Sequence, residues 1–484
     1  MSVQETHLVT EHAAADRPWS VETAGLESIP DHHRHGTASE LFWVWVGANI
    51  GIVAIVYGAV LTGLGLNLWQ GAVAAVLGSA LSFVLVGVLG VAGKWGGSPM
   101  LGLSRIPFGR RGNLAPTLVS WISLLGWETV SAVIAAYALL ALLATIWHVP
   151  ATPLWMLVSL FVVAVAALLL GRLGHATIVW VERFVTWTFG LLTLAVVPWL
   201  VMRTHWTAVL AVHPGSWLAL LGGIGIVAAS TGISWTNLAA DYTRYLPRHE
   251  RGRAIVGWTT LGSTAPLAVL IVVGLLLSST VDGLATSTDP IGAIGAVLPS
   301  WLAIPYLLAA IGGLLAQLVM GLYSSGLNLL ALGVRLRRSR TVVIDGVVIL
   351  VAGVYIMVVQ ADFSGFLISF VQLLACGVAT WAAVCLVDMA LRRGYDNACL
   401  ESSGLVPNTS PGPSASRGGA GWPALTAWLA GSVIGLLFTA SPLFTGPFAV
   451  GIFGQSSLGY LLGFAVSAVS YAILGRKVTR RAVT

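Results

Sequence analysis

Long apolar runs, separated by short polar stretches, fill the chain from residue 41 to residue 475. A helix needs about 20 apolar residues to cross a bilayer. The runs are continuously apolar and lack the alternation that marks the strands of a membrane barrel. The pattern therefore predicts an all-α polytopic membrane protein. We expect twelve transmembrane helices, near residues 41–66, 70–93, 115–146, 153–171, 178–202, 215–238, 254–281, 302–333, 341–361, 364–391, 422–444 and 449–475.

The positive charges indicate how these helices are oriented. If the N-terminus is cytoplasmic, 23 of the 24 Lys and Arg residues fall in cytoplasmic segments, and only Arg203 falls outside. Positive residues gather in the cytoplasmic loops of membrane proteins. The count predicts a multi-pass protein of the cell (inner, cytoplasmic) membrane with both termini in the cytoplasm.

Two helical interruptions suggest where a polar solute binds. Residues 47–51 break the first predicted span around Asn49, and residues 230–237 break the sixth with Gly232, Ser234 and Trp235. Irregular backbone at mid-membrane depth is tolerated where it lines a cavity, and matched breaks in two halves indicate a binding site. These spans begin two sets of five, which predicts a five-plus-five inverted repeat with two extra C-terminal helices. Close helix packing through small residues is the alternative.

The polar segments divide the chain into five parts. The parts are a cytoplasmic tail (1–40), a ten-helix inverted-repeat transport core (41–392), a flexible cytoplasmic linker rich in Gly, Ser and Pro (393–421), two additional transmembrane helices (422–475) and a cytoplasmic C-terminal tail (476–484).

The composition excludes several classes of protein. Only 9% of the residues are charged, against roughly 25% in soluble domains. A soluble enzyme and a disordered chain are therefore excluded. The pI is near 9.5, but basic residues are few and scattered, so no nucleic-acid partner is expected. Five histidines lie in residues 1–35 without regular ligand spacing, so we expect a solvated tail and no metal site.

The third predicted span holds the strongest candidate residue. Glu128 is the only acidic residue that we place well inside a span, where an acid costs about 3 kcal/mol. It should face the bundle interior, protonated or paired, as a proton-coupling or ligand-bonding group; a structural hydrogen bond is the alternative. Trp127 and Ser131 lie four residues apart and share a helix face. We expect Asp345 and Asp388, near helix ends, to pair with nearby arginines.

The eighth predicted span carries a polar stripe. Gln317, Ser324, Ser325 and Asn328 interrupt a long apolar run, with Ser324 and Asn328 on one face. Membrane serines often bond their own backbone, so the stripe alone is weak support for a cavity.

Several motifs resemble those of the nucleobase:cation symporter-1 family, especially its purine-cytosine permease branch. They are residues 96–100 (GGSPM), 103–113 (LSRIPFGRRGN), 239–247 (AADYTRYLP) and 322–327 (LYSSGL), and the resemblance runs from about residue 40 to 390. It implies a LeuT-like fold, alternating access and a bound nucleobase or related ring. The cytoplasmic motif residues Arg105, Asp241 and Arg244 are expected to form a gate; orientation by positive charge is the alternative.

The resemblance also implies roles for individual residues. Trp127 matches a tryptophan that stacks on substrate, and Ser131 stands where a relative has a glutamine that bonds the ring. Trp235 is displaced by about three positions from the corresponding tryptophan of the hydantoin carrier. The expected substrate-binding residues are Asn49, Trp127, Glu128, Ser131, Gly232, Ser234, Trp235, Ser324 and Asn328. The expected cation-coupling residues are Ala48, Gly51, Glu128, Gln317, Ser324 and Ser325.

One departure from the family pattern concerns the coupling ion. Sodium-using members carry hydroxyls and asparagines before the tyrosine of the eighth span, whereas residues 316–321 here read AQLVMG. Unless Ser324 and Ser325 serve instead, sodium lacks its oxygen ligands, so proton coupling through Glu128 is favoured. We expect no cofactor other than this coupling ion, H⁺ or Na⁺.

The resulting hypothesis is a secondary active importer of cytosine, a purine, uracil, allantoin or a hydantoin, working as a monomer in the lipid bilayer. An amino-acid or amine symporter on the same fold is the alternative. A membrane-embedded enzyme is disfavoured because no catalytic motif is present, and a channel because the two halves are unequal.

Overall fold

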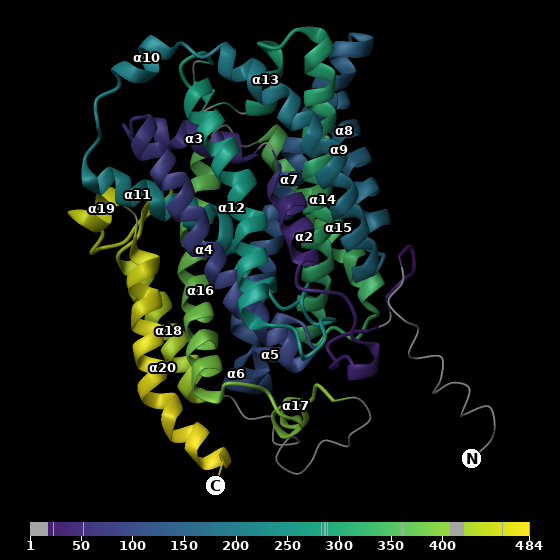
Figure 1. Ribbon diagram of the computed structural model, residues 1–484, viewed down its shortest axis with the longest axis vertical. Helices are drawn as coiled ribbons and strands as arrows, with labels where there is room; N and C mark the ends of the chain where they lie inside the picture. Colours follow the sequence, from purple (N-terminus) through teal and green to yellow (C-terminus); the bar gives the residue numbers. More distant parts are fainter. Residues whose placement is uncertain are drawn as a thin grey trace, which may run out of the picture.

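The computed structural model is a bundle of helices that run along its long axis (Figure 1). It describes residues 18–483 except 23, 52, 282, 285, 286, 288, 360–362, 407–420 and 457, and gives the side chains of 363–365 and 477–483 no description. The larger helices are α2 (Glu40–Asn49), α3 (Val53–Gly63), α4 (Leu68–Gly96), α7 (Leu114–Trp147), α8 (Pro153–Gly171), α9 (His175–Met202), α11 (Trp217–Ala228), α12 (Gly252–Leu277), α14 (Ser300–Ala331), α15 (Arg338–Val358), α16 (Phe363–Arg392), α18 (Trp422–Leu437) and α20 (Gly459–Val483).

Shorter elements connect the large helices. They are η2 (Asp31–His33), α5 (Met100–Leu103), α6 (Arg105–Gly112), α10 (Trp206–Ala211), η3 (Ala229–Ile233), η4 (Thr236–Leu238), α13 (Pro290–Ala296), α17 (Asn397–Ser402), α19 (Ile452–Ser456) and the strands β1 (Ala440–Ser441) and β2 (Phe444–Thr445).

The helices account for most of the predicted spans. Ten are long and apolar enough to cross a bilayer, and the bent pair α2 and α3 raises the number to as many as eleven among the described residues. The predicted span 422–444 differs, because α18 ends at Leu437 after 16 residues. The chain then turns through the antiparallel β1–β2 hairpin, so fewer residues remain helical than the apolar run suggests. Twelve complete spans therefore stay a prediction.

Both predicted helix interruptions are present. Helix α2 ends at Asn49 and α3 begins at Val53, with a 61° bend between them. Helix α11 passes into the π-helical turn η3, where Thr231 leaves helical geometry (φ −112°, ψ −105°). A broken membrane helix must satisfy its freed backbone groups. Here the Gly232 N–H donates to Ser82 Oγ of α4 at 3.2 Å.

Helix α12 anchors one side of the bundle, and α14 the other. Helix α12 packs on α4, α3 and α2, while α14 packs on α7 and α9. Helices α18 and α20 pack on each other and on α16, at the edge of the bundle. The two broken spans therefore lie among helices that are widely separated in sequence.

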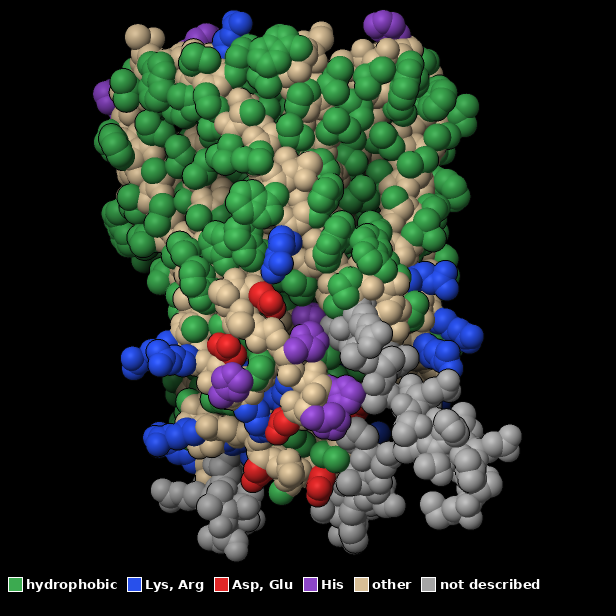
Figure 2. Space-filling view, turned by 45° about the vertical axis from the view of Figure 1, so that its right-hand side comes forward, with side chains coloured by type: hydrophobic (Ala, Val, Ile, Leu, Met, Phe, Trp, Pro, Cys, Tyr) green, Lys and Arg blue, Asp and Glu red, His purple; other side chains and the backbone are tan. Residues whose placement is uncertain are grey.

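Charge separates the two ends of the molecule. Lys94, Arg251, Arg337 and Arg392 lie where α4 and α16 end and where α12 and α15 begin, and we call this the charged end. Figure 2 shows Lys, Arg, Asp and Glu side chains gathered at this end, below a broad apolar surface. Large hydrophobic side chains away from the charged end, such as that of Trp69 at the start of α4, are exposed. A helix bundle with this surface is suited to lipid around its middle.

Part of the predicted linker has regular structure. Within 393–421, Asp396 Oδ1 accepts a hydrogen bond from Cys399 N at 2.8 Å and caps helix α17. Leu405, just beyond α17, is fully buried and its carbonyl accepts from Ser28 N at 2.6 Å. Residues 407–420 of the predicted linker, and residues 1–17 of the predicted tail, lie outside the described residues.

Candidate functional site

A cavity of about 370 Å³ lies between α7, the break at η3 and α14, and we call it the central cavity. It is lined by Leu124, Trp127, Glu128, Ser131, Ser230, Ser234, Trp235, Gln317 and Gly321. Five of these residues are among those predicted to bind substrate: Trp127, Glu128, Ser131, Ser234 and Trp235. The fold therefore brings the polar residues of the third and sixth predicted spans to one place, with Gln317 from the eighth.

Two tryptophans give the central cavity aromatic walls. Trp127 is half-buried and meets Phe370 of α16 edge-on, with ring centroids 6.1 Å apart. Trp235 is buried and meets Trp45 of α2 edge-on, at 5.6 Å and an interplanar angle of 87°. Edge-to-face contacts hold aromatic rings in fixed orientations. The two rings are thus supported from behind by other aromatic side chains.

Glu128 lies in a space that a glycine leaves open. Its side chain is buried, and neither carboxylate oxygen makes a hydrogen bond within the described part of the chain. A Cβ at Gly321 of α14 would lie 2.9 Å from Glu128 Cγ. A larger residue at 321 would therefore displace the carboxyl from the central cavity.

Two predicted substrate residues in the helix breaks face other helices. The amide of Asn49 donates to Trp45 O at 2.9 Å and to Ser263 Oγ of α12 at 3.4 Å. Gly232 lies against Ser82 of α4. Neither residue lines the central cavity.

Most of the predicted polar stripe of α14 lies closer to the charged end than the central cavity does, whereas its Gln317 lines that cavity. Ser324 Oγ lies 3.2 Å from the hydroxyl of Tyr242, which follows η4. Asn328 Nδ2 donates to Ser120 Oγ of α7 at 2.7 Å, as does Asn237 Nδ2. These contacts join the end of the broken span to α7 and α14.

The predicted cation-coupling residues divide into two groups. Gln317 approaches the α2–α3 break, since a Cβ at Gly51 would lie 3.8 Å from Gln317 Oε1. Ala48 is buried one residue before the end of α2. Ser325 lies beside Glu128 and donates to Asp345 Oδ2 at 2.6 Å. No group of three or more His, Cys, Asp or Glu side chains is placed to hold a metal ion in the part of the chain that the structure describes.

The two buried acids that were predicted to pair with arginines are satisfied in different ways. Asp345 also accepts from Trp121 Nε1 at 2.9 Å and has no arginine partner among the described ion pairs, so its predicted arginine pairing is wrong. A serine hydroxyl and an indole N–H meet its hydrogen-bonding needs instead. Asp388 pairs with Arg392 at 2.9 Å, which confirms the pairing predicted for it.

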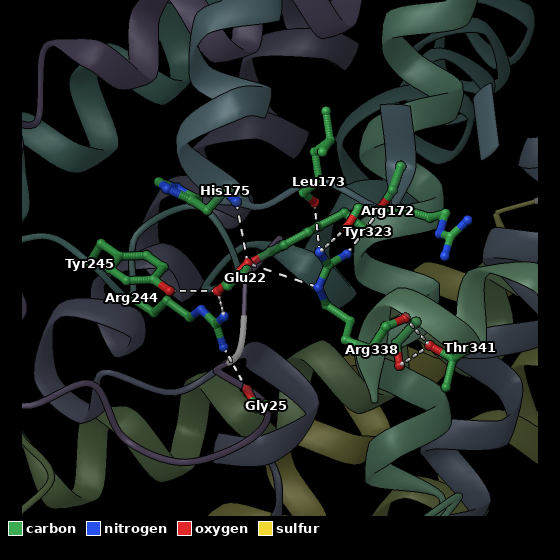
Figure 3. A network of polar contacts seen from close by, with 12 residues as sticks. Glu22, Gly25, Arg172, Leu173, His175, Arg244, Tyr245, Tyr323, Arg338 and Thr341 are labelled. Carbon is green, nitrogen blue, oxygen red and sulfur yellow. Dashed lines mark hydrogen bonds and ion pairs between the residues drawn. The ribbon is translucent and has the colours of Figure 1, made fainter. Parts of the chain in front are cut away.

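The three predicted gate residues lie at the charged end and make separate contacts. Arg105 donates to Ala331 O at 3.1 Å, and Asp241 Oδ1 accepts from Met100 N at 2.8 Å. Burial raises the pKa of Asp241 to about 7, although the hydrogen bond from Met100 opposes this shift. Arg244 forms an ion pair with Glu22, which precedes the first span (Figure 3). The described ion pairs do not include one between Arg105 and Asp241.

Two acidic residues in this region were missed by the sequence analysis. Glu182 is fully buried in α9, and neither of its carboxylate oxygens has a hydrogen-bond partner among the described residues. Glu128 is therefore not the only acid well inside a span. The predicted span began at residue 178, whereas α9 begins at His175 and carries Glu182 two turns into the helix. Glu22 gave no sequence signal beyond its charge, because its arginine partners are more than 200 residues away.

Glu182 lies beside the break in the first span. A Cβ at Gly47 of α2 would overlap Glu182 Oε2 and lie 2.9 Å from the Glu182 carbonyl oxygen. One turn further along α9, Thr186 Oγ1 donates to Trp43 O at 3.2 Å. The close approach of α9 to α2 thus depends on glycine at position 47, which was a signal available in the sequence.

Two further cavities lie toward the two ends of the molecule. One of about 680 Å³ shares Ser230 with the central cavity and extends past Tyr57 of α3 to Pro290 of α13, at the end opposite the charged end. The other, about 590 Å³, is the charged-end cavity. It is lined by His35, Thr37, Glu40, Leu41, Val44, His175, Ala176, Val179, Tyr242, Tyr245 and Leu246.

Comparison with known sequences shows similarity over nearly the whole chain. The family described as permeases for cytosine/purines, uracil, thiamine and allantoin matches residues 28–477. The putative purine-cytosine permease YxlA of Bacillus subtilis (strain 168) is 25% identical over 467 residues, which cover 94% of this chain and 96% of that protein. The purine-cytosine permease fcyB of Emericella nidulans is also 25% identical, over 94% of this chain and 88% of that protein.

Comparison with solved structures shows which fold the bundle has. Mhp1, a nucleobase-cation-symport-1 family transporter, superposes in its closed, bromovinylhydantoin-bound conformation with a TM-score of 0.74 and 17% identity, over 96% of this chain and 97% of that one. Its inward-facing conformation gives a TM-score of 0.70. MhsT in complex with L-phenylalanine gives 0.55 at 13% identity, over 90% of this chain and 99% of that one. These likenesses establish a shared LeuT-like fold.

Proposed function

Because this chain belongs to the nucleobase:cation symporter-1 family, in its purine-cytosine permease branch, we propose that it imports a nucleobase or related planar heterocycle by cation-coupled alternating access. As a member of a permease family it is a transporter and not an enzyme. Substrates of the cytosine, purine, uracil, allantoin or hydantoin class suit the site.

The lining of the central cavity is the observation that carries this proposal. Trp127 and Trp235 offer ring faces, while Glu128, Ser131 and Ser234 offer hydrogen-bonding groups for the edge of a ring. A flat heterocycle has an apolar face and a polar edge, and it therefore matches both kinds of wall. An amino-acid or amine solute, the alternative, would leave one tryptophan face without a partner.

Proton coupling is favoured over sodium coupling by the donor set. Glu128 in the central cavity and Glu182 beside the α2 break are buried carboxyls without hydrogen bonds among the described residues. An ionised carboxylate is costly in such a place unless it is paired, so each is suited to carry a proton. Sodium needs several oxygen ligands, and Ala316, Leu318 and Val319 supply none from their side chains.

The proposal extends to the arrangement of the chain in the membrane. We propose twelve spans, with α18 as a short one, an inverted repeat of five plus five, and a cell-membrane location with the charged end in the cytoplasm. We also propose that the protein works as a monomer.

A thermal-shift and competition panel on the purified protein tests the proposed substrate class. The panel contains cytosine, uracil, adenine, hypoxanthine, allantoin, a hydantoin, and amino acids including L-phenylalanine, with and without sodium and across pH. We expect at least one heterocycle to raise the melting temperature, with little response to sodium. Trp127→Ala should abolish this shift, whereas Trp69→Ala, a matched control on the exposed apolar surface, should keep it.

A response to amino acids and to no heterocycle would overturn the substrate class. A heterocycle response that requires sodium at every pH would instead retain the substrate class and contradict proton coupling.

A further inference from the structure

Residues 18–22 and 24–39, which precede α2, lie at the charged end of the bundle (Figure 1), and we call them the N-terminal strap. The strap follows the loop after α4: Ile29 N donates to Gly97 O at 2.8 Å, and Ser98 Oγ donates to Leu26 O at 2.6 Å. Ser28 N donates to Leu405 O at 2.6 Å. A segment expected to be a solvated tail is therefore held by buried backbone contacts.

One side chain of the strap, Glu22, contacts four separate parts of the bundle (Figure 3). Its Oε1 pairs with Arg244 and accepts from the hydroxyls of Tyr245 at 2.5 Å and Tyr323 at 3.3 Å. Its Oε2 accepts from His175 N at 3.2 Å and lies 3.9 Å from Arg338 Nε. These partners belong to the segment after η4, to α14, to the start of α9 and to the start of α15.

Among the described ion pairs, Glu22 is the acid that pairs with both Arg244 and Arg338, and Asp241 is a further acid near Arg244. Arg244 also donates to Gly25 O at 2.7 Å, and Arg338 to Gly171 O at 3.1 Å. Both guanidinium groups are buried and lie over the ring of Tyr323, at 6.0 and 4.7 Å. Carbonyls and rings accept hydrogen bonds and cations without cancelling charge. Removing one partner of a buried ion pair leaves an uncompensated charge and is strongly destabilising.

The strap also lines the charged-end cavity. His35 and Thr37 of the strap line the charged-end cavity together with Tyr242 and Tyr245. On its other side, Tyr242 donates to Met320 O at 3.0 Å, beside Gly321, which lines the central cavity. Tyr242 thus connects the wall of the charged-end cavity to the part of α14 that lines the central cavity.

We propose that the N-terminal strap is the latch of the charged-end gate, with Glu22 as its locking residue. While Glu22 holds Arg244, Arg338 and the start of α9 together, these elements cannot separate, and the central cavity stays closed toward the charged end. Release of solute at that end requires the carboxylate to leave the two arginines. The latch rests on the proposed transport function, because a gate has a role only if the central cavity opens toward this end.

Thiol labelling of the charged-end cavity tests the latch. Val44 lines this cavity and is 1% exposed, so Val44→Cys reports opening. Cys376 and Cys385 are buried, and Cys399→Ser removes the remaining, partly exposed thiol. In detergent and without any solute, Glu22→Gln should raise the labelling rate at least tenfold, because the amide keeps the shape and loses the charge.

Glu27→Gln is the matched control in the same strap. Glu27 accepts a hydrogen bond from Gly25 N at 2.8 Å, which a glutamine oxygen can also accept, and it forms no ion pair among the described residues. The labelling rate of this variant should equal that of the parent. An unchanged rate in folded Glu22→Gln, or an equal rise in Glu27→Gln, would overturn the latch.

A charge-balanced variant covers the case in which Glu22→Gln does not fold. Glu22→Gln combined with Arg338→Gln removes the acid together with one buried cation. The thiol at position 44 of this variant should be labelled at the rate expected for an open gate. Slow labelling of this folded double variant would also contradict the latch. Because no solute is present, these outcomes are separate from those of the heterocycle panel.

Discussion

Four buried acids that lie within helices fall into two classes by their hydrogen-bond partners. Asp345 receives hydrogen bonds from Trp121 and Ser325, and Asp388 pairs with Arg392. Glu128 and Glu182 have no hydrogen bond among the described residues. A buried polar group without a partner costs free energy and needs an explanation, such as a functional role or an unseen ligand. For these two residues, we propose that a proton taken up and released during transport provides that explanation.

Replacing Glu128 or Glu182 with glutamine should show whether buried acids without hydrogen bonds carry protons, unlike buried acids that have partners. Glutamine keeps the size of the side chain but carries no exchangeable charge, so Glu128→Gln and Glu182→Gln should each lower uptake driven by a proton gradient at least about tenfold, equivalent to about 1.4 kcal/mol. Each variant should also flatten the dependence of uptake on pH. The measurement is initial uptake in proteoliposomes at several external pH values.

The matched control is Asp388→Asn, whose carboxylate pairs with Arg392 and accepts a hydrogen bond from Tyr471. It should lower thermal stability and leave the shape of the pH profile unchanged. Uptake by Glu182→Gln with the pH profile of the parent would remove Glu182 from the coupling mechanism and leave Glu128 as the only candidate.

At the scale of elements, the first broken span is held by backbone-to-backbone packing. A Cβ at Gly274 of α12 would overlap the Ile55 carbonyl oxygen of α3, and a Cβ at Gly58 of α3 would overlap the Ile271 carbonyl oxygen of α12. Small residues let membrane helices approach closely. The pair Gly58 and Gly274 therefore fixes the distance between α3 and α12.

Gly274→Ala should lower the free energy of unfolding by about 1–3 kcal/mol, because an inserted methyl group in a tight contact forces the backbones apart. Gly257→Ala is the control on the same helix, since a Cβ there meets nothing within 4 Å. It should be neutral or slightly stabilising. Thermal unfolding in detergent at matched scan rates compares the two variants, and equal melting temperatures would mean that this contact relaxes without cost.

At the scale of the whole molecule, helix α9 runs from the charged end to the opposite end. Helix α9 begins at His175, in the Glu22 network of the charged end, and finishes before Arg203, the one positive residue predicted to lie outside. Arg203 is exposed and packs over Trp199 at 4.7 Å. Its position opposite the charged end agrees with the count of positive residues.

Cysteine labelling on intact cells should reveal the orientation. In a Cys399→Ser background, an impermeant maleimide should label Arg203→Cys from outside. Arg337→Cys, exposed before α15, should label only after permeabilisation. The reverse pattern would invert the proposed topology, and labelling of both from outside would contradict the number of spans between them.

The sequence predicted most of the fold because its signals are local. Hydrophobic length marks each span, and Gly, Ser and Asn at 47–51 and 230–237 mark the two breaks that the structure contains. The exception is the segment after Leu437, where a hairpin replaces the end of an apolar run. Apolar composition alone does not specify whether a short segment is helical.

At the site, the sequence predicted which polar residues are buried near the cavity more reliably than which neighbours their side chains face. Trp127, Glu128 and Ser131 share one helix face, and all three line the central cavity. Asn49 and Ser325 were chosen by the same reasoning, but their side chains turn toward Ser263 and Asp345. Which neighbour a polar side chain faces depends on how helices are rotated and packed, and that information is not present in a single helix.

The sequence by itself determined a membrane-spanning helical bundle, its broken spans and the segregation of its charge, because hydropathy, small residues and arginines act over a few turns of chain. Only the tertiary structure decided that Glu182 is buried beside Gly47 and that Glu22 joins Arg244 to Arg338. These contacts connect residues more than 100 positions apart. The first depends on close helix packing and the second on buried charges that meet only in the folded bundle, and no local sequence pattern records either of them.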